Sequence, residues 1–270
     1  MGIRKLWPVV TKAIKPTSGR IPDIIPAGPH RVFLVDLFGS FFTSIRYFFA
    51  TNPGNIPQAI AGIHRLLTSR FAHVQANVEI YVDGHRITEK AGTSIERFEN
   101  TVDAVISVEE NIVLEMEQKA EIGRAVSKAR HGRCERQLWQ AYSLTFADRR
   151  SIETGLRALG WTVFLADGEA DLAIEKRSSM IATLNPAIEP VVVSGDSDFL
   201  IYPNVRAIYR PTSNQEFLFY DVAECWDQLG LSRAKLTALG IVCHNDYSEN
   251  IYGFAVATNL SIIKNLDEGI

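Results

Sequence analysis

The chain has 270 residues, of which 46% are hydrophobic, and a formal net charge of −3. This composition is typical of a soluble globular domain with enough apolar side chains for a sizeable core, and no apolar run reaches the ~18 residues of a membrane-spanning helix. The three cysteines are far apart in the sequence. They exclude a disulfide framework and a zinc knuckle, and they indicate a reducing compartment.

Basic side chains are concentrated in two segments. Residues 1–20 contain five lysines and arginines and no acid, and residues 119–150 contain eight against three acids. Either cluster alone is more typical of a solvated helix face. Together, on either side of an acidic centre, they favour a surface that follows phosphate groups.

The apolar pattern predicts an α/β chain. A segment with four prolines at 15–30 should run extended over the surface. Short apolar runs predict buried strands of a mostly parallel sheet at 32–35, 78–82, 161–165 and 191–193, with a closing pair at 205–209 and 216–220. Helices are expected at 41–49, at 56–71 after an Asn55 or Asn52 cap, from about 170, after the caps Asp221 and Ser232, and at 257–266. Residues 84–150 contain no convincing strand and predict a helical insertion.

Carboxylates follow the predicted strands. They are Asp36 after RVFLV, Asp83 after VEIYV, Glu169 and Asp171 after WTVFLADG, Asp196 and Asp198 after PVVVSG, and Asp246 in LGIVCHNDY. Ligands of open α/β sheets bind at the carboxyl ends of the strands, and seven acids gathered there would repel one another without a cation. A single acid, such as Asp196 or Asp198, is better interpreted as a helix cap. The whole set predicts a divalent metal site.

The same segments resemble the flap endonuclease/XPG family of structure-specific 5′ nucleases over essentially the whole chain. MGIRKLW resembles the N-terminal signature of the family, LVDLFGSFF its first acidic block and YVDGHR its second. GEADLAIE resembles the paired-acid block, SGDSDFLIY the Asp-x-Asp block, and HNDYSENIYGF the entrance to the helix–two-turn–helix element. Five blocks in family order, at near-family spacing, make the resemblance specific.

The resemblance implies roles for individual residues. It makes the seven carboxylates metal ligands, with Asp83, Glu169, Asp171 and Asp196 closest to the ions and the others acting partly through water. It implies that Lys90 and Arg97 act on the scissile phosphate from an arch, although a solvated helix face would explain both. Phe42 matches a stacking aromatic and is equally well interpreted as a core residue. Residues expected to bind nucleic acid also include Gly2 and Gly253 from the resemblance, and Arg4, Lys5, Lys128 and Arg130 from the basic segments.

The resemblance also implies an architecture. We expect a PIN-like three-layer nuclease core over 1–222, made of an N-terminal region (1–110), a helical arch (about 84–150) and an internal region (about 151–222). A helix–two-turn–helix region over 223–270 should follow, apparently truncated. The family's second hairpin glycine is replaced, since the matching residues here are Gly253, Phe254 and Ala255.

The implied function is a 5′ nuclease that uses two Mg²⁺ ions, for which Mn²⁺ can substitute, and cuts branched or flapped DNA in repair or replication in the nucleus. Its partner is nucleic acid, with RNA an option; no membrane partner and no clamp-binding motif are expected. One alternative is a weak or inactive relative that serves as an RNA-associated, post-transcriptional scaffold. A PIN-type ribonuclease shares the acidic pattern but needs neither the arch nor the region after Asp246.

Overall fold

The computed structural model describes residues 3, 6–21, 30–85, 91–122, 132, 136–137, 139, 141–212, 215–243 and 254–266, without the side chains at 91–98, 100, 104, 116, 120 and 122. The statements below concern these residues. None of their helices is both long and apolar enough to cross a membrane.

A seven-stranded, mostly parallel sheet forms the centre of the molecule, in the order β1-β7-β6-β5-β2-β3-β4. The parallel strands are β2 (His30–Asp36), β3 (Val78–Val82), β4 (Thr162–Leu165), β5 (Ile188–Val193) and β6 (Ala207–Pro211); β7 (Phe217–Asp221) and β1 (Thr17–Gly19) continue the sheet antiparallel. The chain proceeds from β2 through β3 to β4 on one side, and then crosses to β5 on the other side of β2. The order therefore changes direction between β2 and β5, which is where open α/β sheets bind ligands.

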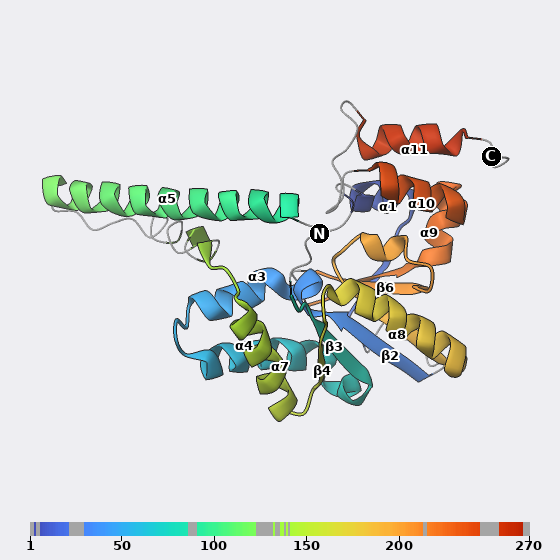
Figure 1. Cartoon of the computed structure of the whole chain (residues 1–270), viewed down its shortest axis with the longest axis horizontal. Helices are drawn as coiled ribbons and strands as arrows, with labels where there is room; N and C mark the ends of the chain where they lie inside the picture. Colours follow the sequence, from blue (N-terminus) through green and yellow to red (C-terminus); the bar gives the residue numbers. More distant parts are fainter. Residues whose placement is uncertain are drawn as a thin grey trace.

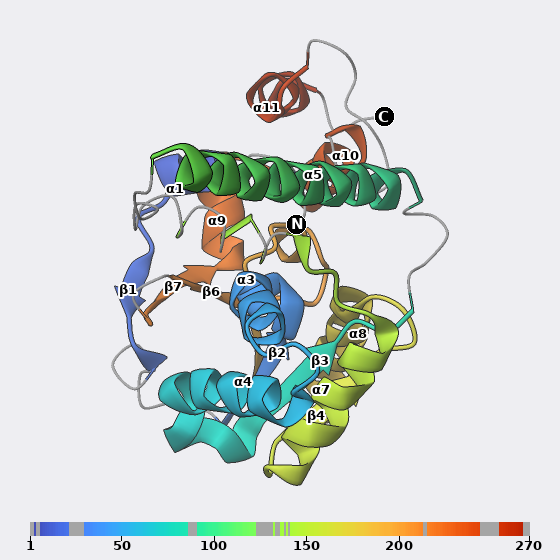
Figure 2. The same cartoon turned by 90° about the vertical axis from the view of Figure 1, so that its left-hand side faces the viewer.

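Two helical layers cover the sheet (Figures 1 and 2). One layer consists of α3 (Leu37–Ala50), α4 (Ile56–Phe71) and α7 (Phe146–Ala158); the other contains α8 (Ala170–Leu184), with α1 (Leu6–Ala13), α9 (Val222–Leu229), α10 (Arg233–Val242) and α11 (Val256–Lys264). Successive strand residues point to opposite faces. Phe33 and Val35 accordingly join the α3–α4–α7 core, whereas Leu34 joins the other core. The expected PIN-like α/β architecture, with a mostly parallel central sheet, is confirmed.

Local signals explain where the helices begin. The Asn55 side chain accepts a hydrogen bond from the Gln58 amide at the start of α4, and Asp221 and Ser232 cap α9 and α10 in the same way. A reciprocal capping box between Thr145 and Asp148 starts α7. These caps satisfy amides that have no partner within the helix. Two short 3-10 helices, Ala72–Asn77 and Asp198–Leu200, complete the described elements.

The proline-rich segment differs from its prediction where it is described. Residues Thr17–Gly19 form β1, which pairs with β7, and Ile21 is fully buried. Helix α1 precedes it and was not predicted. Its Leu6 and Val10 are buried against α9 and α11, contacts that pair segments more than 200 residues apart.

The long helix α5 (Ala91–Ile122) supplies the predicted helical insertion. At 1.5 Å per residue its 32 residues span about 48 Å, and Figure 1 shows it extending away from the sheet. Its side chains Ser107 and Asn111 hydrogen-bond Gln137 at 2.7 and 3.1 Å. The chain that returns toward α7 thus lies against α5 at this point.

Candidate metal centre at the carboxyl edge of the sheet

Carboxylates from four parts of the chain meet at one edge of the sheet. Asp36 ends β2, Asp83 follows β3, Glu169 and Asp171 begin α8 after β4, and Asp196 and Asp198 follow β5. Parallel pairing of these strands brings their carboxyl ends to the same edge. Six of the seven predicted carboxylates therefore lie at this edge, beside the point where the strand order reverses. Asp246, the seventh, lies outside the described residues.

Asp36 is buried and held by two donors. Its carboxylate accepts a hydrogen bond from the Gly39 amide (2.9 Å), which caps α3, and another from the Ser194 hydroxyl (2.8 Å). A side chain at Gly39 would place its Cβ 1.9 Å from an Asp36 carboxylate oxygen. The sequence LVDLFG therefore combines the acid with the glycine that leaves room for it. Asp36 is both a helix cap and a member of the acidic cluster.

Asp83 is fixed by the start of α8 and by α7. The Ala170 amide donates to its carboxylate at 2.8 Å. The Arg149 guanidinium donates to the carbonyl oxygens of Asp83 and Gly84, at 3.4 and 2.7 Å. A Cβ at Gly84 would lie 1.7 Å from the Ala166 carbonyl oxygen, so the β3 and β4 loops pack closely because this residue is a glycine.

Hydrogen bonds hold Asp171 and connect the acids after β5 to Asp36. The Tyr202 hydroxyl donates to Asp171 at 2.9 Å, and the Asp198 amide donates to the Asp196 carboxylate at 3.1 Å. Asp196 itself donates its amide to the Ser194 hydroxyl, which bonds Asp36. A continuous chain of hydrogen bonds thus joins the ends of β2 and β5.

The N-terminal segment closes this edge. The Ile3 amide donates to the Asp198 carboxylate at 2.8 Å, and the Ser197 hydroxyl donates to the Ile3 carbonyl at 3.1 Å. The Trp7 indole donates to the Gly195 carbonyl at 2.7 Å. Ile3 and Trp7 therefore lie against the loop that carries Asp196 and Asp198.

Burial and mutual repulsion change how these acids titrate. Burial, and then the charges of Asp83 and Asp196, raise the pKa of Asp36 to about 7, against the partial opposition of its two hydrogen bonds. Burial and the neighbouring Asp196 raise the pKa of Asp198 to about 7. Burial also raises the pKa of Asp83, although the Ala170 amide and Arg149 act in the opposite direction. The cluster carries more negative charge than its protein neighbours offset.

The donor set fits a hard divalent cation such as Mg²⁺ or Mn²⁺, which prefers carboxylate oxygens. Among the residues that the structure describes, no three His, Cys, Asp or Glu side chains gather closely enough to surround one ion. Mg²⁺ commonly takes one or two carboxylates and keeps several waters, so a looser arrangement suits it. The site matches a hydrated ion between acids better than a closed protein cage.

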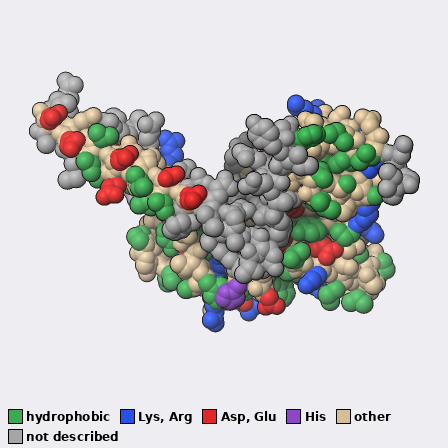
Figure 3. Space-filling model, turned by 45° about the horizontal axis from the view of Figure 1, so that its top comes forward, with side chains coloured by type: hydrophobic (Ala, Val, Ile, Leu, Met, Phe, Trp, Pro, Cys, Tyr) green, Lys and Arg blue, Asp and Glu red, His purple; other side chains and the backbone are tan. Residues whose placement is uncertain are grey.

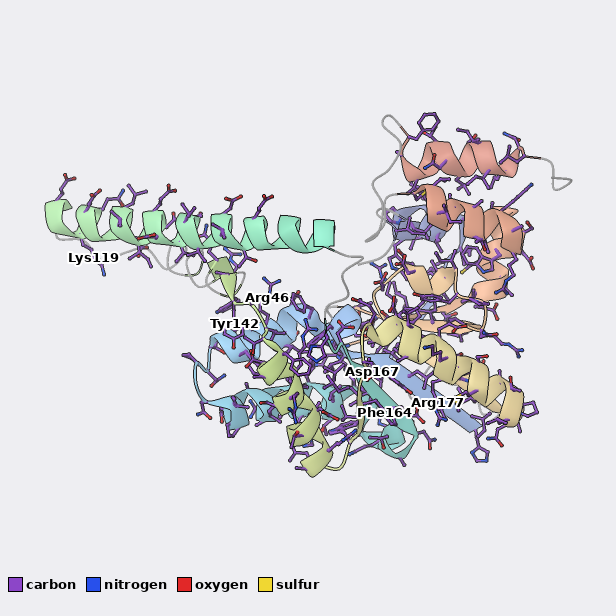
Figure 4. All side chains as sticks on the ribbon, in the orientation of Figure 1. Arg46, Lys119, Tyr142, Phe164, Asp167 and Arg177 are labelled. Atoms are coloured by element: carbon purple, nitrogen blue, oxygen red, sulfur yellow. The ribbon has the colours of Figure 1, made fainter. Side chains whose placement is uncertain are left out.

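Phe42 lies on α3, whose first turn is capped by Asp36. Its side chain is 38% exposed, packs edge-on against Phe38 with ring centroids 6.0 Å apart, and lies 4.6 Å from the Arg46 guanidinium. Arg149 lies over the other ring, that of Phe38, at 5.4 Å. This exposure is compatible with a stacking role for Phe42 and with a packing role. Arg46, on the same helix, is labelled in Figure 4.

The remaining predicted residues are not placed. Arg97 belongs to α5, but its side chain lies outside the described part of the chain, as do all atoms of Gly2, Arg4, Lys5, Lys90, Lys128, Arg130 and Gly253.

Sequence reasoning missed Ser194, Arg149 and Tyr202, each of which bonds a site residue. Ser194 lies within the acidic block SGDSD, so its hydroxyl could have been recognised as a hydrogen-bond donor to the acids. Arg149 and Tyr202 reach the site from 66 and 31 residues away. No local pattern marks such partners, because only the folded chain brings them near.

Neither a family model nor a curated protein gives a significant match to the chain. Solved structures do. The catalytic core of Rad2 in complex with DNA substrate covers 98% of this chain and 69% of its own, at 17% identity and a TM-score of 0.59. Human GEN1 in complex with Holliday junction DNA covers 97% and 55%, at 17% identity and a TM-score of 0.53. Flap endonuclease-1 from Methanococcus jannaschii covers 93% and 75%, at 14% identity and a TM-score of 0.51.

These likenesses extend over nearly the whole chain, as the resemblance of the acidic blocks implied. The chain has the PIN-like fold of the flap endonuclease and XPG-type nuclease structures.

Proposed function

We propose that the chain is a metal-dependent, structure-specific nuclease that hydrolyses phosphodiester bonds in branched or 5′-flapped DNA. The observation that carries the proposal is the convergence of carboxylates from β2, β3, β5 and the start of α8 at the edge where the strand order reverses. Uncompensated buried charge is costly for a fold. The raised pKa values of Asp36 and Asp198 express this cost, which a bound cation would relieve.

Six described acids and Asp246 would hold the ions. The residues proposed as closest are Asp83, Glu169, Asp171 and Asp196, with Asp36, Asp198 and Asp246 acting partly through water. Two bound Mg²⁺ ions, or Mn²⁺ in their place, would supply a more acidic attacking water and stabilisation of the leaving oxygen.

The other residues of the site position these acids. Ser194 and the Gly39 amide orient the Asp36 carboxylate, Tyr202 orients Asp171, and the Ala170 amide orients Asp83. The Gly39 and Ala170 amides belong to the first turns of α3 and α8, and Ser194 and Tyr202 lie in the segment after β5. These bonds hold the carboxylates before substrate arrives. Such preorganisation is what makes electrostatic stabilisation effective.

DNA is the proposed substrate because the Rad2 and GEN1 structures of the same fold are complexes with DNA. Phe42, 38% exposed on the helix that Asp36 caps, is proposed to stack on a base or sugar. Lys90 and Arg97 would contact the scissile phosphate, and Gly2, Arg4, Lys5, Lys128, Arg130 and Gly253 would bind the remaining backbone.

A cleavage assay tests the proposal. The full chain should cut a 5′-flap oligonucleotide with Mg²⁺ and not with EDTA, and Asp83→Asn or Asp196→Asn should reduce the rate at least 100-fold. Asp227→Asn, at an exposed acid of α9, is the matched control and should keep full activity. Intact DNA binding without any Mg²⁺-dependent cleavage, on flap, gapped, bubble and single-stranded DNA and RNA, would refute it.

One observation favours a second candidate, the non-catalytic scaffold. Among the described residues, no three metal-ligating side chains lie close enough to surround one ion, and a protein that binds no ion has no need of such a group. Calorimetric titration with Mg²⁺ and Mn²⁺ separates the two candidates. If the chain is a scaffold, it should show no Mg²⁺ or Mn²⁺ binding that is lost in Asp83→Asn.

A further inference from the structure

Helix α5 is strongly acidic, which sets it apart from a phosphate-binding arch. Residues 91–122 hold eight carboxylates and only two basic side chains, Arg97 and Lys119. Lys119 lies near the far end of the helix, as labelled in Figure 4. Beyond Arg97 the helix holds seven carboxylates and one lysine, and a surface of this charge repels nucleic acid. The helix therefore calls for a different kind of partner.

One side of α5 combines exposed apolar residues with a row of acids. At about 100° per residue, five exposed apolar residues fall within a sector about 120° wide, which we call the outward stripe: Val102, Val105, Ile106, Ile112 and Val113, each 38–48% exposed. Leu114, 46% exposed, lies outside this sector. Glu109 interrupts the outward stripe, and an acidic row runs along one border: Glu99, Asp103, Glu110, Glu117 and Glu121, all exposed. Figure 3 shows hydrophobic and acidic side chains side by side along this helix.

The opposite side of α5 already has its partner within the chain. Val108 is only 5% exposed, and Ser107 and Asn111 hydrogen-bond Gln137. By the same helical periodicity Ser107 and Asn111 lie about 160° from the centre of the outward stripe, and Val108 lies about 100° from it. The returning chain thus packs on one side, and the outward stripe faces away from it. Five β-branched apolar side chains in one stripe are more than scattered surface residues.

The negative charge of α5 limits which kind of partner can bind the outward stripe. Nucleic acid and anionic membranes are negative, and a second α5 would bring its own acids against the acidic row. A helix with an apolar stripe bordered by lysines or arginines matches both features, as in paired helices whose flanking charges select the partner. We propose that the outward stripe and acidic row of α5 form a docking site for a basic amphipathic helix of a partner protein. This site is separate from the carboxylate edge of the sheet.

A synthetic peptide tests the docking site. The probe is a fluorescein-labelled 21-residue helical peptide with a leucine stripe bordered by lysines, and its twin carries glutamates instead. The full chain should bind the lysine peptide and not the glutamate twin in fluorescence anisotropy. Ile106→Ser with Val113→Ser should weaken binding at least tenfold. Leu184→Ser with Ile241→Ser, which removes exposed apolar side chains from α8 and α10, should not change it.

A charge exchange separates specific docking from general attraction. Asp103→Lys with Glu110→Lys should lose the lysine peptide and gain the glutamate twin. All substituted side chains are exposed, so circular dichroism should show unchanged helix content. Equal binding of the lysine peptide to every variant would overturn the proposal, as would a dimer of the chain in sedimentation that the stripe substitutions dissolve. Loss of flap-DNA binding in the stripe variant would also overturn it, by assigning the stripe to substrate.

Discussion

Asp36 shows how one side chain combines structure and chemistry. It caps α3 through the Gly39 amide and bonds Ser194, yet burial and the neighbouring acids raise its pKa to about 7. The interpretation of strand-end acids as helix caps is thus correct for Asp36. Asp198 does not cap a helix. The short 3-10 helix that it begins has Ser197 at its N-cap position, without a side-chain hydrogen bond, and the Asp198 carboxylate instead accepts a hydrogen bond from the Ile3 amide. Capping alone does not explain the cluster.

The raised pKa of Asp36 predicts a pH-dependent stability in the metal-free protein. The folded state holds a proton up to about pH 7 that the unfolded chain releases near 3.8. The free energy of unfolding should therefore fall as pH rises from about 4 to about 7, by at most about 1.4 kcal/mol per pH unit for each such group, and then level off. Asp36→Asn should reduce this slope in EDTA. Urea unfolding at pH 5 and 7.5 measures it, and an unchanged slope would contradict the prediction.

Gly39 should tolerate no side chain. A Cβ at this position would meet the Asp36 carboxylate at 1.9 Å and the Ser194 hydroxyl at 2.6 Å. Gly39→Ala should displace the carboxylate, destabilise the fold by about 1–3 kcal/mol and sharply reduce flap cleavage. Gly132→Ala is the control, because a Cβ there meets nothing within 4 Å. Normal unfolding and cleavage in Gly39→Ala would count against the site geometry.

At the scale of elements, α7 connects the helical insertion to the site. It begins with the Thr145 capping box, and its first turn carries Arg149, which bonds the loop after β3. On the other layer, Arg177 of α8, labelled in Figure 4, forms a two-bond ion pair with Glu79 of β3 at 2.9 and 2.6 Å. Strand β3 is therefore held from the α8 layer, and the loop after it from the α7 layer.

Thr145→Ala should loosen the contact of α7 with the loop after β3. Loss of an N-cap side chain costs about 1 kcal/mol, and fraying of the first turn of α7 should weaken the hold of Arg149 on Gly84. We expect lower stability in urea and slower flap cleavage. Ser151→Ala changes a hydroxyl of the same helix that bonds only the Ala147 carbonyl, so it should have little effect on either. Equal behaviour of the two variants would show that the cap does not support the site.

At the scale of the whole molecule, the carboxylate edge joins segments from both ends of the chain. Ile3 and Trp7 bond the loop after β5, nearly 200 residues away. Because the site assembles only in the folded state, a cation that binds there must stabilise the fold as a whole. Repulsion between the acids opposes folding in its absence.

Mg²⁺ should therefore raise the melting temperature of the full chain. At a concentration 100 times its Kd, one bound ion contributes about 2.7 kcal/mol to stability. The increase should disappear in Asp83→Asn and persist in Asp227→Asn, as differential scanning fluorimetry with EDTA or MgCl₂ can measure. A rise of the same size in Asp83→Asn would mean that the ion binds elsewhere.

The sequence by itself determined six of the seven strands and the acids that follow them along the chain. Helix α4 begins and ends where predicted, and β3 has the predicted bounds. These features follow from short-range patterns. A parallel strand that is buried on both faces is apolar along its whole length, and the apolar run ends where the chain turns. The domain division and the residue roles taken from the resemblance stay predictions.

Only the tertiary structure decided how the acids are held and which side of α5 faces outward. Ser194 after β5 bonds Asp36 at the end of the neighbouring strand β2, Arg149 reaches Gly84 from α7, and α1 is buried against helices from the far end of the chain. The exposed side of α5 is defined by Gln137, which lies on its opposite side. Such contacts join residues far apart in the sequence, and their geometry follows from the packing of whole layers rather than from any local pattern.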